Sequence, residues 1–181
     1  MMQYFELFFR GFTTNILITA CAAFWPLVLG ILLSLFVKKS AVVSAIVDAV
    51  NIPLESISVP LAMMALFYTL GRFFHIGNLN VYTVIVVMAL SLAYLFYMPT
   101  RYNEGYSFIK NILYNGLGLI SWLFKWSFVA SFVGVMDALG AARNLVARTY
   151  QFWPYTVVFL VAFGILFVIE LLRFLVKKLI K

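Results

Sequence analysis

Lys125 is the residue of this sequence whose type and position most favour a chemical role. It stands inside an apolar stretch, between WLF and WSFV. A lysine near the middle of a bilayer costs on the order of 3 kcal/mol by insertion scales, so it must face protein, water or an acidic partner. A lysine close to one membrane face can instead extend its ammonium to the interface. Both interpretations stay open: a residue that lines a polar path, or a snorkelling anchor.

Three further ionisable residues stand beside or within apolar stretches. Glu170 and Arg173 are three positions apart, a spacing at which two side chains of one helix form an ion pair. Asp137 follows the apolar stretch that ends at Val135, and an aspartate there either caps the next helix or binds a partner. The sequence predicts a local ion pair between 170 and 173 and leaves two roles open for Asp137.

Residue patterns of known catalytic and metal sites are missing from the sequence. It has one histidine, His75, and one cysteine, Cys21, so no Cys/His cluster of metal-site spacing exists. Paired carboxylates, a phosphate-cradling glycine loop and a serine elbow are also absent, and the Gly116 and Gly118 pair indicates close helix packing. We expect no enzyme, no metal and no cofactor.

Composition decides what surrounds these residues. The chain is 65% hydrophobic and 10% charged, with a mean hydropathy of +1.06, whereas soluble domains are about 45–50% apolar and about 25% charged. The net charge of +7 comes from basic residues at the ends of apolar runs, such as Lys38, Lys39, Lys177 and Lys178. This pattern is typical of anchors at anionic lipid headgroups, not of a nucleic-acid interface. The sequence predicts an all-α membrane protein.

Apolar runs long enough to cross a bilayer, roughly 20 residues, occur about five times. They cover residues 14–37, 57–74, 81–98, 112–135 and 155–176. Pro26 and Gly30 lie inside the first run and predict a kink. The stretch 40–58 is too short and too polar for a sixth span; it is expected at the interface or as a short helix packed on the bundle.

Basic residues predict how these five spans are oriented. One set of loops holds Lys38, Lys39, Arg101, Lys110, Lys177, Lys178 and Lys181, and the other holds Arg10, Arg72, Arg143 and Arg148. Since the cytoplasmic side carries more lysine and arginine, seven against four favours an outside N-terminus and an inside C-terminus. Residues 136–151, more polar than any span, are expected to form a short amphipathic helix at the outer surface.

A family resemblance begins within the fourth span, at Lys125. Residues 125–151 read KWSFVASFVGVMDALGAARNLVARTYQ and precede a last apolar run with a basic tail. This stretch resembles the C-terminal part of polar amino-acid ABC transporter permeases. Lys125 matches a lysine of that family, Ser127 its hydroxyl position and Ser131 the serine before a G-V pair. Asp137 stands where a glutamate is usual, and NLVARTY fits the family's surface helix. Earlier in the chain, Gly11 with Thr14 or Asn15 is similar to the G-x-x-x-T opening of the family's first span.

The loop before the fourth span departs from the family. Such permeases carry a long cytoplasmic loop there, whose E-A-A-x-x-x-G segment forms a short helix that docks in a groove of the ATPase. Residues 101–112 read only RYNEGYSFIKNI. Trp126 and Phe128 also replace the usual aspartate and serine. The resemblance therefore implies a degenerate member that has lost the standard coupling segment.

The resemblance implies a permease-type subunit of an ABC importer for amino acids or similar small polar solutes, in a bacterial cytoplasmic (inner) membrane. Its partners would be membrane lipid, a second permease subunit, a cytoplasmic ATP-binding subunit and an extracytoplasmic solute-binding protein. The candidate pathway residues are Lys125, Ser127 and Ser131, and the candidate partner or coupling contacts are Arg101, Glu104, Lys110 and Asp137. The alternative is a non-transporting accessory membrane subunit derived from a permease.

Overall fold

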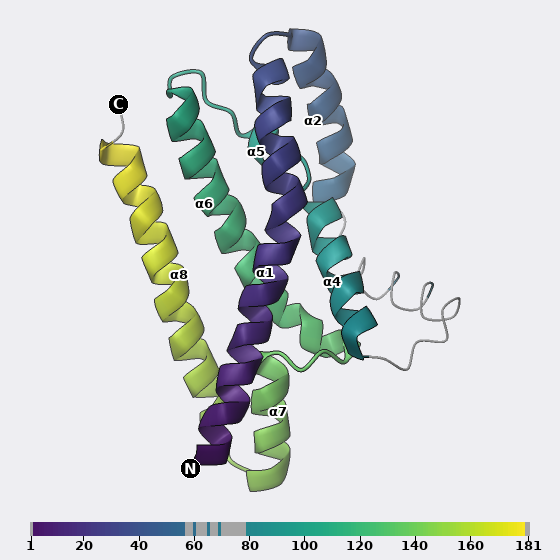
Figure 1. The fold of residues 1–181 in the computed structure, drawn as a ribbon, viewed down its shortest axis with the longest axis vertical. Coiled ribbons are helices and arrows are strands. Elements are labelled where there is room, and N and C mark those ends of the chain that lie inside the picture. The colour runs from purple at the N-terminus through teal and green to yellow at the C-terminus, as the bar shows by residue number, and fades with distance from the viewer. Residues whose placement is uncertain (1, 57–59, 61–64, 66–68, 70–78, 180–181) are drawn as a thin grey trace.

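The protein is described by a computed structural model that covers residues 2–56, 60, 65, 69 and 79–179 (Figure 1). Within these residues the secondary structure is helical, with no strand. The elements are α1 (Met2–Val37), α2 (Ala41–Ser56), α4 (Leu79–Ala93), α5 (Tyr97–Thr100), α6 (Phe108–Ser127), the 3₁₀ helix η1 (Phe128–Val133), α7 (Ala138–Thr149) and α8 (Trp153–Leu179). The predicted all-α architecture is confirmed.

α1 is the central helix of the bundle. It contacts α2, α4, α5, α6 and α7, and its 36 residues span about 54 Å at 1.5 Å per residue. That length exceeds the roughly 30 Å of a bilayer's hydrocarbon core. The helix begins twelve residues before the predicted span and continues through Pro26 without interruption.

The chain runs up α1, down α2, up α4, down α6 and up α8 in the view of Figure 1, so its two termini lie at opposite ends of the bundle. Among the described residues, four helical segments are long and apolar enough to cross a membrane: Tyr4–Val37, Thr83–Thr100, Phe108–Val133 and Trp153–Leu179. They correspond to the first, third, fourth and fifth predicted spans. The second, 57–74, lies outside the described residues except for positions 60, 65 and 69.

The stretch that was too polar for a span of its own forms α2. This helix packs against α1, α4 and α5, which confirms the alternative of a short helix packed on the bundle. Its outward residues Val42 and Ile46 are 69% and 59% exposed. An apolar outer face of this kind suits contact with lipid.

Two breaks shorten the regular helix of the third and fourth spans. The third span pauses at residues 94–96 and restarts as α5, which places Pro99 in a first helical turn, where its missing N–H is tolerated. The fourth span continues into the 3₁₀ helix η1. Ser127, at the end of α6, and Ser131, within η1, donate hydrogen bonds to carbonyls three residues back. Gly134, with φ of 91°, ends η1 in the left-handed conformation that glycine adopts without strain.

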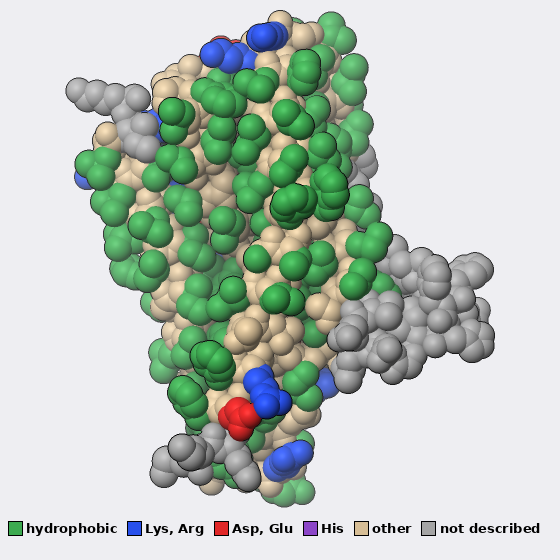
Figure 2. Space-filling model, in the orientation of Figure 1, with side chains coloured by type: hydrophobic (Ala, Val, Ile, Leu, Met, Phe, Trp, Pro, Cys, Tyr) green, Lys and Arg blue, Asp and Glu red, His purple; other side chains and the backbone are tan. Residues whose placement is uncertain are grey.

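The core has two parts. The larger joins α1, α4 and α6 through buried residues such as Ile18, Val86 and Leu119, and the smaller joins α1, α7 and α8 through Phe8, Leu145 and others. Outside this core, hydrophobic side chains cover much of the visible face between charged groups near the two ends (Figure 2). A surface of this kind is expected where lipid, and not water, is the solvent.

Candidate functional site

Lys125, the leading pathway candidate, lies on the exposed side of α6. Its Nζ stands 5.4 Å from the ring centroid of Trp122, a cation–π distance. No carboxylate among the described residues forms an ion pair with it. The lysine therefore faces the surroundings of this chain, where lipid interface or a partner subunit would meet it.

The two pathway serines point into the protein. Ser127 is 0% and Ser131 5% exposed. Ser127 Oγ accepts a hydrogen bond from Asn15 Nδ2 (2.8 Å) and donates one to the Phe124 carbonyl. Both hydroxyls are thus engaged within the chain, and they do not share a surface with Lys125.

Arg101 and Glu104 belong to the short connection from α5 to α6, and Lys110 lies in the first turn of α6. This connection lies toward the end of the bundle that holds the C-terminus (Figure 1). Arg101 stacks over the Tyr97 ring at 4.0 Å, and Lys110 lies 4.3 Å from the ring centroid of Tyr106.

Two asparagines of α6 stabilise this connection. Asn111 Nδ2 donates to the Asn103 carbonyl (2.8 Å), its Oδ1 accepts from the Asn103 N–H (2.9 Å), and Asn115 Nδ2 donates to the Arg101 carbonyl (3.0 Å). Three side-chain hydrogen bonds thus define the backbone of a connection that the sequence had marked only as unusually short.

Asp137 is fully buried and caps α7, because its Oδ1 accepts the Gly140 N–H at 2.7 Å. The capping role is confirmed. Asn15 of α1 also stabilises the start of α7. Its Oδ1 accepts the Ala138 N–H (2.9 Å), and its Nδ2 donates to Ser127. We call Asn15, Ser127, Asp137 and Ala138 the Asn15 junction; it joins α1, the end of α6 and the start of α7.

Burial raises the pKa of Asp137 from 3.8 to about 6, although the Gly140 N–H opposes the shift. The native carboxyl therefore holds its proton at a pH where the unfolded chain has released it. Stability from this group is complete below pH 3.8 and is lost as the pH rises through about 6, by at most about 3 kcal/mol.

Asp137→Asn should remove this pH dependence and keep the cap, since asparagine is an equally good N-cap residue. Between pH 4 and pH 7 the unfolding temperature of the wild-type chain is expected to fall further than that of the variant. Thermal unfolding of both purified proteins across this range measures the difference. Parallel pH profiles would contradict the buried, titrating carboxyl.

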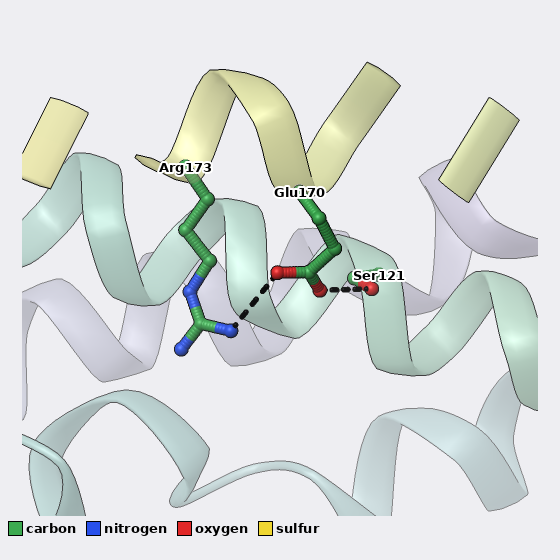
Figure 3. A network of polar contacts seen from close by, with 3 residues as sticks. All are labelled: Ser121, Glu170 and Arg173. Atoms are coloured by element: carbon green, nitrogen blue, oxygen red, sulfur yellow. Dashed lines mark hydrogen bonds and ion pairs between the residues drawn. The ribbon is translucent and has the colours of Figure 1, made fainter. Parts of the chain in front are cut away.

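A second polar cluster lies between α6 and α8, within the membrane-spanning segments (Figure 3). Ser121 Oγ of α6 donates to Glu170 Oε1 of α8 at 2.8 Å, and Arg173 Nη1 donates to Glu170 Oε2 at 3.4 Å. The predicted pair of Glu170 and Arg173 is confirmed. We call Ser121, Glu170 and Arg173 the Glu170 cluster.

The surroundings of Arg173 are aromatic and close-fitting. Its Cζ lies 4.3 Å from the ring centroid of Tyr114, and its buried Nε has no hydrogen-bond partner among the described residues. A Cβ on Gly118 would come within 2.8 Å of the Tyr97 hydroxyl and 3.1 Å of Arg173 Cζ. The glycine leaves the space in which the arginine and the two tyrosines meet.

Two properties make the Glu170 cluster the best candidate site: it lies within a membrane-spanning segment, and the side chain of Glu170 is partly exposed. Glu170 precedes Lys177 by seven residues, about 10 Å along the helix. Its side chain is 44% exposed and that of Arg173 22%. Ionisable groups within a spanning segment are functional candidates by default, because leaving them in hydrocarbon is costly.

Sequence reasoning missed Ser121 and the tyrosines of this site. The sequence does contain a signal for this site. Tyr114, Gly118 and Ser121 stand at i, i+4 and i+7, so one face of α6 carries a phenol, a position without a side chain and a hydroxyl, in that order. Among the described residues, no group of three metal-ligating side chains occurs. The cluster offers hydrogen bonding and charge to a ligand or partner.

Comparison with known proteins agrees with a membrane transporter fold. No protein-family model and no curated protein sequence matches the chain. One solved structure, described as an amino acid ABC transporter with histidines, superposes with a TM-score of 0.79 over 99% of this chain and 97% of that chain, at 18% sequence identity. This chain and the matched chain of that transporter thus share a fold.

Proposed function

We propose that the chain is a permease-type subunit of an ABC importer for amino acids or similar small polar solutes. The observation that carries this proposal is the likeness along the full length to an amino acid ABC transporter. The chain would form part of a translocation pathway with a second permease subunit, and a separate cytoplasmic subunit would bind and hydrolyse ATP. This chain would then act without catalysing a reaction itself.

The Glu170 cluster supports a role in moving polar solutes. A carboxylate that keeps 44% of its side chain exposed has acceptor capacity left after bonding Ser121 and Arg173. Such a group can accept hydrogen bonds from an ammonium or from a polar group of a facing subunit. In a pathway between two permease subunits, it would line the wall that α6 and α8 present.

The basic end of the bundle supports the proposed orientation. Lys38, Lys39, Lys110, Lys177 and Lys178 all lie at or beside the end that holds the C-terminus. With that end in the cytoplasm of a bacterial cell, the positive-inside rule is satisfied. The ATP-binding subunit would then meet the bundle at Arg101 and Lys110, outside the walls of the cavity that Lys38, Asp48 and Glu104 line, and a solute-binding protein would meet the opposite end.

Uptake by the assembled complex tests the proposal. The chain should co-purify with a second permease and an ATP-binding subunit, and proteoliposomes containing the complex should take up radiolabelled amino acids on addition of ATP. Glu170→Gln removes the charge but keeps a hydrogen-bond acceptor for Ser121. We expect it to lower the uptake rate about tenfold, equivalent to ~1.4 kcal/mol of barrier.

Glu6→Gln is the matched control for this variant. Glu6 also pairs with an arginine of its own helix, Arg10 at 2.7 Å, but both side chains are more than 60% exposed and stand near the opposite end of the bundle. Its uptake rate should equal that of the wild type. Uptake that survives Glu170→Gln and Lys125→Ala unchanged would refute the pathway role and favour the accessory subunit.

A further inference from the structure

A polar cavity of about 500 Å³ opens at the end of the bundle that holds the C-terminus. Its walls come from the turn between α1 and α2, from one face of α2, and from the end of α5 with the chain that follows it. Ser40, Ser44 and Asp48 line it at intervals of four residues, so one polar stripe of α2 faces the cavity while Val42 and Ile46 face outward.

Four charged residues of both signs line this cavity: Lys38, Lys39, Asp48 and Glu104. The lysines belong to the turn after α1, one carboxylate to α2 and the other to the connection after α5. None of the four makes an ion pair with another described residue. Two cations and two anions thus stand around one space without neutralising each other directly.

The volume of the cavity fits a small group. Its volume of about 500 Å³ falls within the range of about 300–1,000 Å³ that small-molecule sites occupy. Asp48 lies eight residues beyond Ser40, about 12 Å along α2. The ligand must carry separate positive and negative groups to meet opposite charges over such a length.

The position of the cavity indicates the membrane interface. Val37 and Thr100, which line it, are the last residues of two membrane-spanning segments. The cavity therefore stands at the depth of lipid headgroups, beside lysines of the kind that anchor a bundle there.

We propose that this cavity binds the head of a zwitterion that carries a primary ammonium and an anionic oxygen group. The ammonium lies toward Asp48 and Glu104, and the phosphate or carboxylate lies toward Lys38, Lys39 and the Ser40 hydroxyl. The position of the cavity at the ends of two spanning segments favours the headgroup of phosphatidylethanolamine as the source; a free amino acid shares the same chemistry. This site is distinct from the Glu170 cluster and requires only that the chain is embedded in a membrane.

Native mass spectrometry of the full chain, released from micelles, tests the proposal. Phosphatidylethanolamine and phosphatidylglycerol of equal acyl length are offered together, since only the first carries an ammonium. We expect preferential retention of phosphatidylethanolamine. Both Lys38→Gln/Lys39→Gln and Asp48→Asn/Glu104→Gln should weaken that retention about tenfold. Because all four residues lie on the surface, these variants should fold, and Glu104→Gln alone provides a milder carboxylate variant.

Lys177→Gln/Lys178→Gln is the matched control, because it removes two lysines from the same end without touching the cavity. Its lipid retention should equal that of the wild type. Loss of retention in the lysine variant alone, with no effect of the carboxylate variant, would overturn the proposal, since it would show simple attraction of anions.

Free glycine and O-phosphoethanolamine, added as competitors, distinguish the two sources. If neither competes while phosphatidylethanolamine is retained, the ligand is the lipid. If either binds the wild-type chain and not the carboxylate variant, the zwitterion site stands and its source is soluble. Retention of no zwitterion, or occupation of these walls by the ATP-binding subunit in place of lipid, would overturn the proposal.

Discussion

Gly11→Ala is expected to lower the unfolding temperature of the purified chain by roughly 5 °C. A Cβ at this position would lie 2.8 Å from Ala138 Cα, 2.9 Å from the Ala138 nitrogen and 2.9 Å from the Asp137 carbonyl carbon. These are backbone atoms at the start of α7, so no flexible side chain can move aside. Overpacking of this kind costs typically 1–3 kcal/mol, and in a chain of this size each kcal/mol corresponds to about 2–4 °C.

Gly164→Ala is the control for that change. Gly164 lies on α8, also within a helix, and a Cβ there meets no atom within 4 Å. The substitution should leave the unfolding temperature unchanged or raise it slightly, because alanine favours helix more than glycine does. Equal effects of the two substitutions, measured by loss of circular dichroism on heating, would contradict the close approach of α1 and α7.

Asn15→Leu should destabilise the chain by about 2–4 kcal/mol, because it removes both hydrogen bonds that join α1 to the rest of the Asn15 junction. The Ala138 N–H donates to Asn15 Oδ1 at 2.9 Å in a fully buried place. With leucine in position 15, that N–H has lost the acceptor it uses in the native protein. Ser127 is affected less, since its hydroxyl still donates to the Phe124 carbonyl.

Thr19→Val provides the comparison on the same helix. Thr19 is also buried, at 5% exposure, but its hydroxyl donates only to the Asn15 carbonyl of its own helix. Its loss should cost under about 1 kcal/mol. We expect limited proteolysis to cut the connection between η1 and α7 faster in Asn15→Leu than in Thr19→Val. Similar stability and similar cleavage of the two variants would argue against the junction.

The Asn15 junction also gives a structural role to the motif of the first helix that resembles the permease family. The resemblance paired Gly11 with Thr14 or Asn15 and did not choose between the two polar residues. The structure selects Asn15, since Gly11 and Asn15 are four residues apart and both contact the start of α7. Thr14 instead donates to the carbonyl of Arg10 in its own helix.

Local features of the candidate site followed from sequence, and features that join distant segments did not. The pair of Glu170 and Arg173 was predictable because three residues of one helix bring two side chains together. The hydrogen bond between Glu170 and Ser121 joins residues 49 positions apart in the sequence, so it depends on how α6 packs on α8. Lys125 drew attention because it interrupts an apolar run, yet only packing could reveal that it faces outward while Ser127 and Ser131 face inward.

The sequence alone determined that this chain is an all-helical membrane protein, that charge gathers at the ends of its helices, and where four of its spans lie. Those properties follow from the transfer of side chains between water and lipid, which depends on composition and order along the chain. Tertiary structure alone decided that a carboxylate near the basic end meets a serine of another helix, that Asn15 holds the start of α7, and that four charged residues of both signs line one cavity. Such pairings depend on the rotation and register of helices against each other, which are set by side-chain packing between segments far apart in sequence.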